Sequence, residues 1–385
     1  MFIIWFIYIY KMNLAINLIG TSYESGSKTY CINFYKNLKL SSYTKNYKKI
    51  IIFISSSYLK KHEHKKVNKN IKIISVNPIF SNGLLKIVYD QFFFPIQSII
   101  LKAQTIFCPL NYCPLILFFS KKKIILGIHS NLVWLYPKLL PGNILKKILI
   151  KFLMTKSIHV ADKIIFNSKN SKNELEKKIN INKKKNHYIY LGCDHIKKST
   201  TENKNRKKNI LINSSITRYH DISSVFKAFL LLKKKGINLP KILFLTQILD
   251  QQYYFELCKF IKINNLKNKI FFFDNIPNNY TTKFYEKSLF SINSSQIESF
   301  GLPSLESMRR NCPVILSDNK TFREINKNAA LYFKQKKIKQ LSDCIKLLLK
   351  SKIKRNLLIK RGKVVSKEYT WDKTVKKTLE IIFNS

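Results

Sequence analysis

Residues 289–316 read LFSINSSQIESFGLPSLESMRRNCPVIL. An apolar segment is followed by a polar loop, a helix-forming segment and a second apolar segment, which predicts strand, loop, helix and strand in that order. Gly301 permits an unusual backbone or a close ligand approach, and Pro303 suits a first helical turn. Because a helix begins with free N–H groups and the positive end of its dipole, the start of the predicted helix Leu302–Arg309 is expected to bind an anion.

The same alternation extends over both halves of the chain. Unalternating β-branched runs, typical of strands covered on both faces, predict strands at Leu14–Ile19, Ile50–Ile54, Ile71–Val76, Thr105–Cys108, Ile124–Ile128, Lys163–Phe166 and Tyr188–Leu191, and then at Ile210–Asn213, Lys241–Leu245, Ile270–Phe273, Leu289–Ile292 and Pro313–Leu316. Predicted helices include Lys28–Leu40, Leu84–Leu101, Ile144–Lys156 and Ser171–Ile179. This pattern predicts an α/β protein with two Rossmann-like, doubly wound domains that face each other across a cleft, where ligands bind beyond the carboxyl ends of the strands.

The boundary between the halves is marked by composition. Residues 197–209, KKSTTENKNRKKN, contain no apolar residue and are predicted to be a linker. The expected domains are therefore 12–196 and 210–367, and 368–385 is expected to be a helix that packs back on the first domain. The apolar run 2–10 is too short to span a bilayer. We hypothesise that Met12 is the true start; the alternative is a short apolar segment that touches a membrane.

Charge and cysteine content exclude little. The chain has 70 Lys and Arg against 21 Asp and Glu, a net charge of +49, which attracts anions. A genome biased towards A and T would give any protein the same drift, so charge alone assigns no function. Neither a nucleic-acid-binding module nor an aromatic–basic platform is found, and no nucleic-acid partner is expected. The seven cysteines form no C-x-x-C motif, which suggests neither a disulfide framework nor a zinc site and fits a reducing cytoplasm.

Two carboxylates flank the predicted anion site. Glu298 lies in the loop and Glu306 at the shoulder of the buried stripe of the predicted helix. They are either ordinary surface acids or ligands for a hydroxylated molecule. Because acids are scarce in this chain, their position beside a phosphate-type loop favours binding.

These residues also resemble a known family. ESFGLPSLE (298–306) is similar to the E-x-F-G-L-P-x-x-E signature of glycosyltransferase family 4, the retaining, nucleotide-sugar-dependent enzymes of the GT-B fold. The resemblance continues, in the family's order, over GIHSNLVWLYP (127–137), VADKIIFNSKNSKNEL (160–175), YIYLGCD (188–194), INSSITRYHDISSVFKAF (212–229), NAALYF (328–333) and YTWDKTVKKTLEI (369–381). It therefore covers nearly the whole chain from about residue 13.

The resemblance implies a role for each matching residue. Catalytic roles fall to Glu298 on the donor sugar hydroxyls, to Arg218 on the leaving diphosphate and to His129, which polarises the sugar or handles a proton. The resemblance assigns binding of the nucleotide ribose to Glu306 and binding of the diphosphate to the backbone amides of Phe300, Gly301 and Leu302. Further donor-binding positions are Gly26, in a loop where the family has a glycine pair, and His220, where a second basic residue is usual. This chain also departs from the family at three positions: it has Ser130 where Asp is common, Asn213 where Gly is frequent and Asp221 where Asn is common.

The implied reaction moves a hexose-type sugar from a nucleotide diphosphate sugar to a glycan or lipid-linked acceptor, with retention and without a bound metal or cofactor. Cell-surface polysaccharide or lipopolysaccharide synthesis is the expected setting, in the cytoplasm or on the inner membrane face. The alternative is a catalytically impaired GT-B protein that acts as a basic binding protein. A two-carboxylate glycosidase is disfavoured, because Glu298 and Glu306 lie before and inside one helix rather than on opposite sides of a bond.

Two basic segments suggest further partners. The helix predicted over Ile144–Lys156 has apolar side chains on one face and lysines opposite, which is typical either of a helix on an anionic membrane or of an ordinary core-facing helix. The second reading is slightly favoured. KKHEHKK (60–66) could bind a metal through its histidines but is more typical of a solvated loop.

Overall fold

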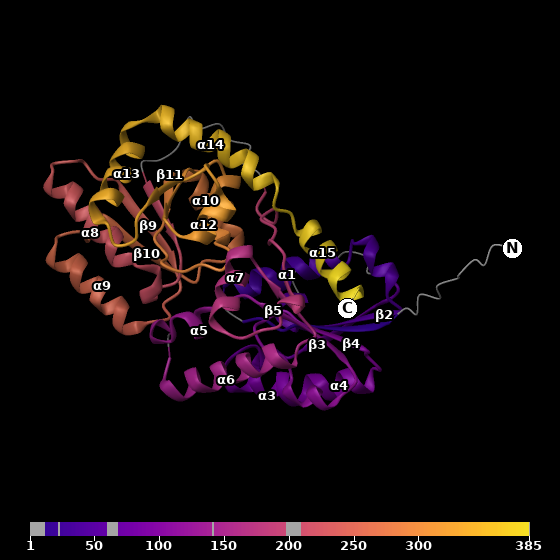
Figure 1. Ribbon diagram of the computed structural model, residues 1–385. Helices are drawn as coiled ribbons and strands as arrows, with labels where there is room; N and C mark the ends of the chain where they lie inside the picture. Colours follow the sequence, from indigo (N-terminus) through magenta and orange to yellow (C-terminus); the bar gives the residue numbers. More distant parts are fainter. Residues whose placement is uncertain (1–11, 22–23, 60–67, 141, 198–208, 385) are drawn as a thin grey trace.

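The computed structural model describes residues 12–21, 24–59, 68–140, 142–197 and 209–384 (Figure 1). The proposed status of residues 1–11, the histidines of 60–66 and most of the predicted linker 197–209 therefore lie outside the described residues. Within the described ranges, no helix is long and apolar enough to cross a membrane.

The first half of the chain forms a parallel sheet of seven strands in the order β3-β2-β1-β4-β5-β6-β7. The strands are β1 (Asn13–Leu18), β2 (Lys49–Ser55), β3 (Ile71–Val76), β4 (Thr105–Cys108), β5 (Lys123–Ile128), β6 (Lys163–Phe166) and β7 (Asn186–Tyr188). The central strands β1 and β2 are almost wholly buried, which explains their unalternating apolar sequences. The strand order reverses between β1 and β4, where such sheets bind ligands.

The second half repeats this plan with six parallel strands in the order β10-β9-β8-β11-β12-β13. The strands are β8 (Asn209–Asn213), β9 (Lys241–Thr246), β10 (Ile270–Asp274), β11 (Ser288–Asn293), β12 (Val314–Ser317) and β13 (Leu331–Phe333). The predicted doubly wound α/β class is thus confirmed in both halves. The short strand β13 was not among the predicted strands, since three residues give no periodicity to recognise.

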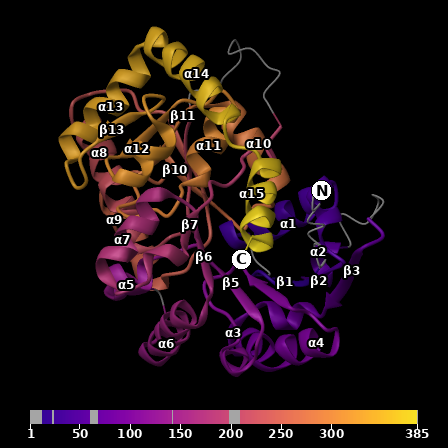
Figure 2. The same cartoon turned by 45° about the vertical axis from the view of Figure 1, so that its right-hand side comes forward.

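Helices cover both sheets (Figures 1 and 2). Those of the first half are α1 (Gly26–Leu38), α2 (Ser56–Leu59), α3 (Gly83–Val88), α4 (Phe94–Ile100), α5 (Leu132–Leu135), α6 (Ile144–Val160) and α7 (Lys169–Lys178). Those of the second are α8 (Ile222–Lys234), α9 (Gln251–Ile263), α10 (Asn278–Lys287), α11 (Leu302–Arg309), α12 (Lys320–Asn326), α13 (Ile338–Lys350), α14 (Lys352–Lys367) and α15 (Trp371–Phe383). The helix predicted over Leu84–Leu101 is α3 and α4 joined by the π-helical turn η3 (Tyr89–Phe93), at which Asp90 is buried.

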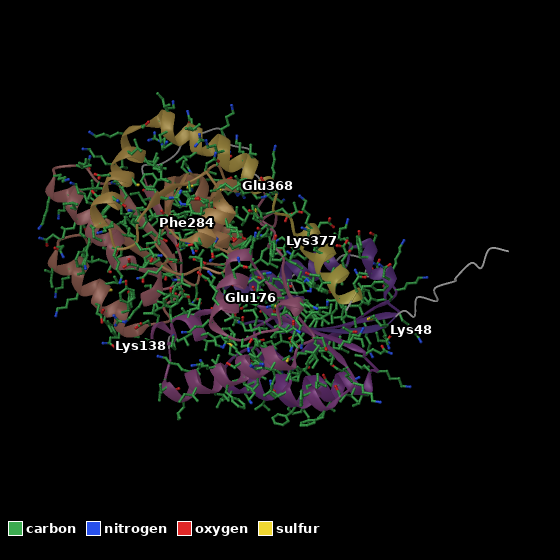
Figure 3. All side chains as sticks on the ribbon, in the orientation of Figure 1. Lys48, Lys138, Glu176, Phe284, Glu368 and Lys377 are labelled. Carbon is green, nitrogen blue, oxygen red and sulfur yellow. The ribbon has the colours of Figure 1, made fainter. Side chains whose placement is uncertain are left out.

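The chain crosses between the sheets twice. After α14 it passes Glu368, labelled in Figure 3, and α15 packs against α1 of the first sheet (Figure 2). The hydroxyl of Tyr47 donates to the carbonyl of Leu379 at 2.8 Å. The two crossing segments touch where Gly192 meets the backbone of Trp371, since a Cβ at residue 192 would lie 2.2 Å from that backbone nitrogen. The last helix therefore ties the second half to the first.

Candidate active site

A cavity of about 440 Å³ lies where the carboxyl ends of the two sheets meet. Its walls come from the start of α1, the loop after β5, the segments after β8, β9 and β10, and the loop between β11 and α11. The strand order reverses between β1 and β4 and between β8 and β11. The cavity therefore occupies the position at which doubly wound sheets bind ligands, and its volume suits a molecule of nucleotide size.

The start of α11 forms one wall of this cavity. Gly301 precedes the helix with a φ of +82°, and no side chain caps the first turn. A Cβ at residue 301 would lie 2.5 Å from the ring of Phe322, so only glycine fits here for both conformational and steric reasons. Phe300, Gly301 and Leu302 all line the cavity, which places the predicted anion site on its wall.

Glu298 faces the same cavity from the loop that precedes α11. Loss of solvent raises the pKa of its carboxyl to about 7, against the opposing effect of hydrogen bonds from the side chains of Ser295 and Asn293. The Glu298 backbone is held as well, because the hydroxyl of Thr321 donates to its carbonyl at 2.8 Å. The side chain is thus positioned to accept hydrogen bonds from a ligand and to change protonation near neutral pH.

Glu306 lies deeper in the wall and is already hydrogen-bonded. Its Oε1 lies 3.0 Å from Nε2 of His195, and the hydroxyl of Tyr285 donates to its Oε2 at 3.3 Å. The Nε1–H of Trp371 donates to Nδ1 of His195 at 3.1 Å. Because an indole N–H can only donate, the His195 ring accepts at Nδ1 and carries its proton on Nε2, facing Glu306. The carboxylate is therefore fixed by residues from three parts of the chain.

His129 lies on the opposite wall, after β5. Its backbone N–H donates to the side chain of Asn111 at 2.7 Å, and its ring meets the ring of Tyr30 edge-on at 4.5 Å between centroids. Burial lowers the pKa of the imidazole to about 4. His129 is thus neutral at physiological pH and can accept or donate one hydrogen bond.

Two further predicted residues also line the cavity: His220, the last residue of η8 (Arg218–His220), and Gly26, the first residue of α1. Burial lowers the pKa of His220 to about 4, although a hydrogen bond to the carbonyl of Ser215 acts in the opposite direction. Among the described residues that line the cavity, none is Lys or Arg. In a chain with 70 such residues, this cavity is lined by three glutamates and two neutral histidines.

The structure departs from the sequence prediction at Arg218. Its guanidinium binds Glu256 through two nitrogens, at 3.0 and 2.7 Å, and lies 3.5 Å from Asp250. Arg218 is not among the cavity-lining residues, and its side chain is 40% exposed. Two of the chain's scarce acids, Asp250 at the N-terminus of α9 and Glu256 within that helix, thus draw the side chain away. The arrangement does not place Arg218 where it would neutralise a diphosphate.

Several residues around the cavity were not recognised in the sequence. His195 follows the apolar segment 188–193, and Trp371 and Tyr285 lie on helices remote from the ESFGLPSLE motif. No local pattern marks them, because their relation to Glu306 arises only from the crossing of the two segments. Within the described parts of the chain, no cluster of His, Cys, Asp and Glu could hold a metal ion.

Comparisons with known proteins agree with this geometry. Residues 194–365 match the sequence family described as "Glycosyl transferases group 1". The chain is 26% identical over 248 residues to the O-antigen chain mannosyltransferase RfbU of Salmonella typhimurium, a match that covers 59% of this chain and 68% of RfbU. Among solved structures, Anabaena HepE in complex with UDP and glucose superposes with a TM-score of 0.70 at 13% identity, covering 96% of this chain and 99% of HepE. WaaG, a glycosyltransferase involved in lipopolysaccharide biosynthesis, superposes with a TM-score of 0.68 at 9% identity, covering 97% of this chain and all of WaaG. The matched segment resembles the group 1 glycosyltransferases, and the two-sheet architecture is the GT-B fold, so together they support a glycosyltransferase.

Proposed function

We propose that this enzyme transfers a hexose, with mannose the first candidate, from a nucleoside diphosphate sugar to a glycan or lipid-linked acceptor in cell-surface polysaccharide synthesis. Transfer proceeds with retention of configuration. The observation that carries the proposal is the convergence of the α11 N-terminus, Glu298 and Glu306 on one cavity between the two sheets. Mannose is favoured because RfbU is a mannosyltransferase.

The donor fits this cavity in one orientation. The diphosphate lies against the amides of Phe300, Gly301 and Leu302, where the helix dipole favours negative charge. The ribose hydroxyls bind Glu306, which His195 orients. The hexose hydroxyls bind Glu298. This orientation uses each fixed group of the α11 wall for a part of the donor that it suits chemically.

In the proposed reaction, the bond between the sugar C1 and the diphosphate oxygen breaks while the acceptor oxygen bonds to C1 on the same face. The acceptor proton passes to the departing diphosphate. Negative charge grows on that diphosphate, and the preorganised N–H groups of the α11 terminus stabilise it. His129 lies across the cavity and holds the sugar through a hydrogen bond as a neutral imidazole.

Ligand-induced stabilisation tests the donor first. A nucleotide that binds only the folded protein raises its stability by about 2.7 kcal/mol at one hundred times its Kd. We expect one of GDP, UDP, ADP and dTDP, and its mannose or glucose conjugate, to raise the thermal midpoint of the full chain. Stabilisation by none of them would contradict the proposal.

Transfer is then measured with the donor that stabilises most and a lipid-linked glycan acceptor. Glu298→Gln keeps the size of the side chain but removes its charge, and we expect turnover to fall at least about a hundredfold. Glu256→Gln is the matched control, since Glu256 lies outside the cavity. Nucleotide binding by the native chain without any transfer would favour the catalytically impaired alternative.

A further inference from the structure

The outer face of the first domain exposes an unusual amount of apolar surface. Of the 27 large apolar side chains that are exposed among the described residues, fifteen lie in three segments. Eight lie between Leu84 and Ile100, three between Ile116 and Phe119, and four between Ile144 and Phe152. These segments are α3, η3 and α4; η4 (Leu115–Phe119); and the first half of α6. We call their shared surface the apolar–basic face.

The three segments are contiguous in space. The turn η4 contacts both η3 and α6, and η3 contacts α3 and α4. Figures 1 and 2 show α3, α4 and α6 along the same side of the first sheet, away from the second domain. The sequence slightly favoured a core-facing α6, but Ile144, Leu145 and Ile148 are all more than half exposed. A surface of this kind marks a docking site, because isolated domains rarely leave so many large apolar groups in water.

The charge of the apolar–basic face identifies what covers it. The three segments of this face contain four lysines, Lys86, Lys146, Lys147 and Lys151, and a single acid, Asp90. That acid is buried and accepts hydrogen bonds from Lys86 and Tyr112. The face is therefore apolar and positively charged, without exposed negative charge. A second copy would bring lysines against lysines, whereas an anionic bilayer offers both an apolar interior and negative headgroups.

We propose that this composite face, and not α6 alone, docks the enzyme on an anionic lipid bilayer. The face is coupled to the cavity through α5. Leu132 of α5 lines the cavity, and Trp134 of the same helix donates through Nε1 to Thr155 of α6 at 2.9 Å. Docking in this orientation brings the first-domain side of the cavity close to the headgroups. The proposal rests on the exposed surface and stands whether or not the proposed donor is correct.

Because the whole chain is basic, binding alone would not identify the face that docks. Phe119 on η4, 88% exposed, is therefore replaced by Trp, and Ile353 on α14, 83% exposed, is replaced by Trp as the control. Vesicles contain phosphatidylglycerol with brominated acyl chains, which quench indole fluorescence within the bilayer. We expect a blue shift and quenching in Phe119→Trp above the native background, and neither in Ile353→Trp. Equal quenching at both positions, or at neither, would overturn the proposal.

Cosedimentation then measures affinity. The double variant Ile148→Ser with Phe152→Ser should bind anionic vesicles about tenfold more weakly, because two inserting side chains are lost. Phe255→Ser with Ile353→Ser is the matched control on the second domain and should bind like the native chain. Unchanged thermal midpoints would show that both fold. Equal losses of vesicle affinity in both double variants would overturn the proposal in favour of general charge attraction. A native dimer that becomes monomeric only in Ile148→Ser with Phe152→Ser would overturn it in favour of self-association.

A second inference starts from the absence of Lys and Arg among the described residues that line the cavity, and it rests on the proposed function. Nδ1 of His220 lies 2.7 Å from the carbonyl of Ser215, which can only accept, so this nitrogen carries the proton of the neutral ring. The other nitrogen, Nε2, then has only a lone pair, which repels a phosphate oxygen. We infer that His220 takes up a proton from solvent when a nucleoside diphosphate binds and so supplies the positive charge that no described cavity-lining Lys or Arg provides.

The surroundings of His220 permit this change. The hydroxyls of Ser215 and Thr217 lie 3.3 and 3.2 Å from Nδ1, and the ring of Tyr219 lies 4.2 Å away between centroids. Asp221 follows in sequence, but its carboxylate accepts from Ser223 and Ser224. The other titratable groups of the cavity are Glu24 before α1, His129 after β5, Glu298 after β11 and Glu306 on α11. A bound diphosphate stabilises the charged imidazole and raises its pKa from about 4.

Calorimetry in two buffers with different heats of ionisation counts the protons taken up with the nucleotide found by thermal shift. We expect uptake near neutral pH, with affinity falling up to tenfold per pH unit as pH rises. His220→Lys should bind more tightly without that uptake, and His220→Asn should bind more weakly without it. Glu298→Gln, which removes the other group that titrates near neutrality, should keep the uptake. The same proton count in native and His220→Asn proteins would overturn this inference, whereas binding of no nucleotide would overturn the proposed function as well.

Discussion

His195 holds Glu306 in place across the boundary between the two sheets. Its Nε2 lies 3.0 Å from Oε1 of Glu306, and the indole of Trp371 fixes the tautomer that makes this bond. Glu306 is on α11 of the second domain, whereas Trp371 begins the helix that packs on the first. Orientation of the predicted ribose-binding carboxylate therefore depends on how the two halves are joined.

His195→Ala removes this support. We expect the nucleotide Kd to rise about tenfold and the free energy of unfolding to fall by about 1–3 kcal/mol, because the 8% exposed Glu306 loses a hydrogen bond to its charge. Titration calorimetry and denaturant unfolding measure the two effects. Tyr285→Phe removes the longer 3.3 Å bond to Glu306, together with the contacts of the same hydroxyl with the Asn213 side chain and the Pro303 carbonyl, and should have the smaller effect on affinity. A larger loss in Tyr285→Phe would contradict the assigned order.

Glu298 gives the folded protein a pH-dependent stability. Its pKa is raised from 4.5 to about 7, so the folded state holds a proton that the unfolded state has released. The associated stability is present below pH 4.5 and is lost as pH rises through 7. Glu298→Gln imitates the protonated form, so its unfolding free energy relative to the native chain should increase across this window by about 3 kcal/mol and then level off. Parallel stability curves for the two proteins would refute the assignment.

Much of this fold can be predicted from the sequence, because buried parallel strands have continuous apolar sequences. β3, β4 and β6 have the bounds predicted for them, and α11 begins and ends as predicted. The helix expected over Leu84–Leu101 differs, since the burial of Asp90 by Asn17 and Tyr112 is a tertiary effect that no local period encodes. The exposed apolar face of α6 is equally invisible, because periodicity reports a stripe but not what covers it.

The residues of the candidate site likewise divide into those that a local sequence motif predicts and those whose placement depends on tertiary contacts. Glu298, Gly301 and Glu306 share one local motif and face one cavity, as expected for a loop that leads into a helix. Arg218 also lies in a recognised segment, yet its direction depends on Glu256 and Asp250, which are distant in sequence. A motif therefore predicts which backbone reaches the site, whereas long side chains follow charges that only the folded structure reveals.

Arg218→Ala should consequently have little effect. The guanidinium forms an exposed ion pair outside the cavity, and such pairs contribute about 0–1 kcal/mol. We expect kcat/KM within about threefold of the native value and a nearly unchanged thermal midpoint. A loss of turnover by a factor of a hundred or more would show that Arg218 swings into the cavity when donor is bound.

Gly301→Ala tests the shape of the anion site. The substitution meets both a φ of +82° and a Cβ 2.5 Å from Phe322, so we expect a loss of about 2–4 kcal/mol in unfolding free energy together with weaker nucleotide binding. Gly236→Ala separates the two causes, because Gly236 has a φ of +70° but no heavy atom within 4 Å of the added Cβ. It should lose only about 1–2 kcal/mol and bind nucleotide normally. Equal losses at both positions would show that the ring of Phe322 moves aside freely.

Glu324 forms a contact between the domains that is suited to hold the cleft closed. Its two carboxylate oxygens accept from the backbone N–H groups of Lys169 and Asn170, at 2.8 and 2.7 Å, at the start of α7. A carboxylate at a helix N-terminus is favoured by the dipole and by charge-assisted hydrogen bonds. Glu324→Gln halves the acceptor capacity and removes the charge, so we expect the interdomain contact to weaken by about 1 kcal/mol.

Small-angle scattering of the full chain measures the effect as a larger radius of gyration, because the domains separate more often when Glu324 no longer bridges them. Glu176→Gln is the matched control: Glu176, labelled in Figure 3, lies on the same helix α7. Its carboxylate accepts from Asn186 within the first domain at 2.9 Å. That variant should scatter like the native chain. If Glu324→Gln also leaves the scattering unchanged, the burial of Tyr369 and Trp371 between the crossing segments, rather than this carboxylate, holds the two halves together.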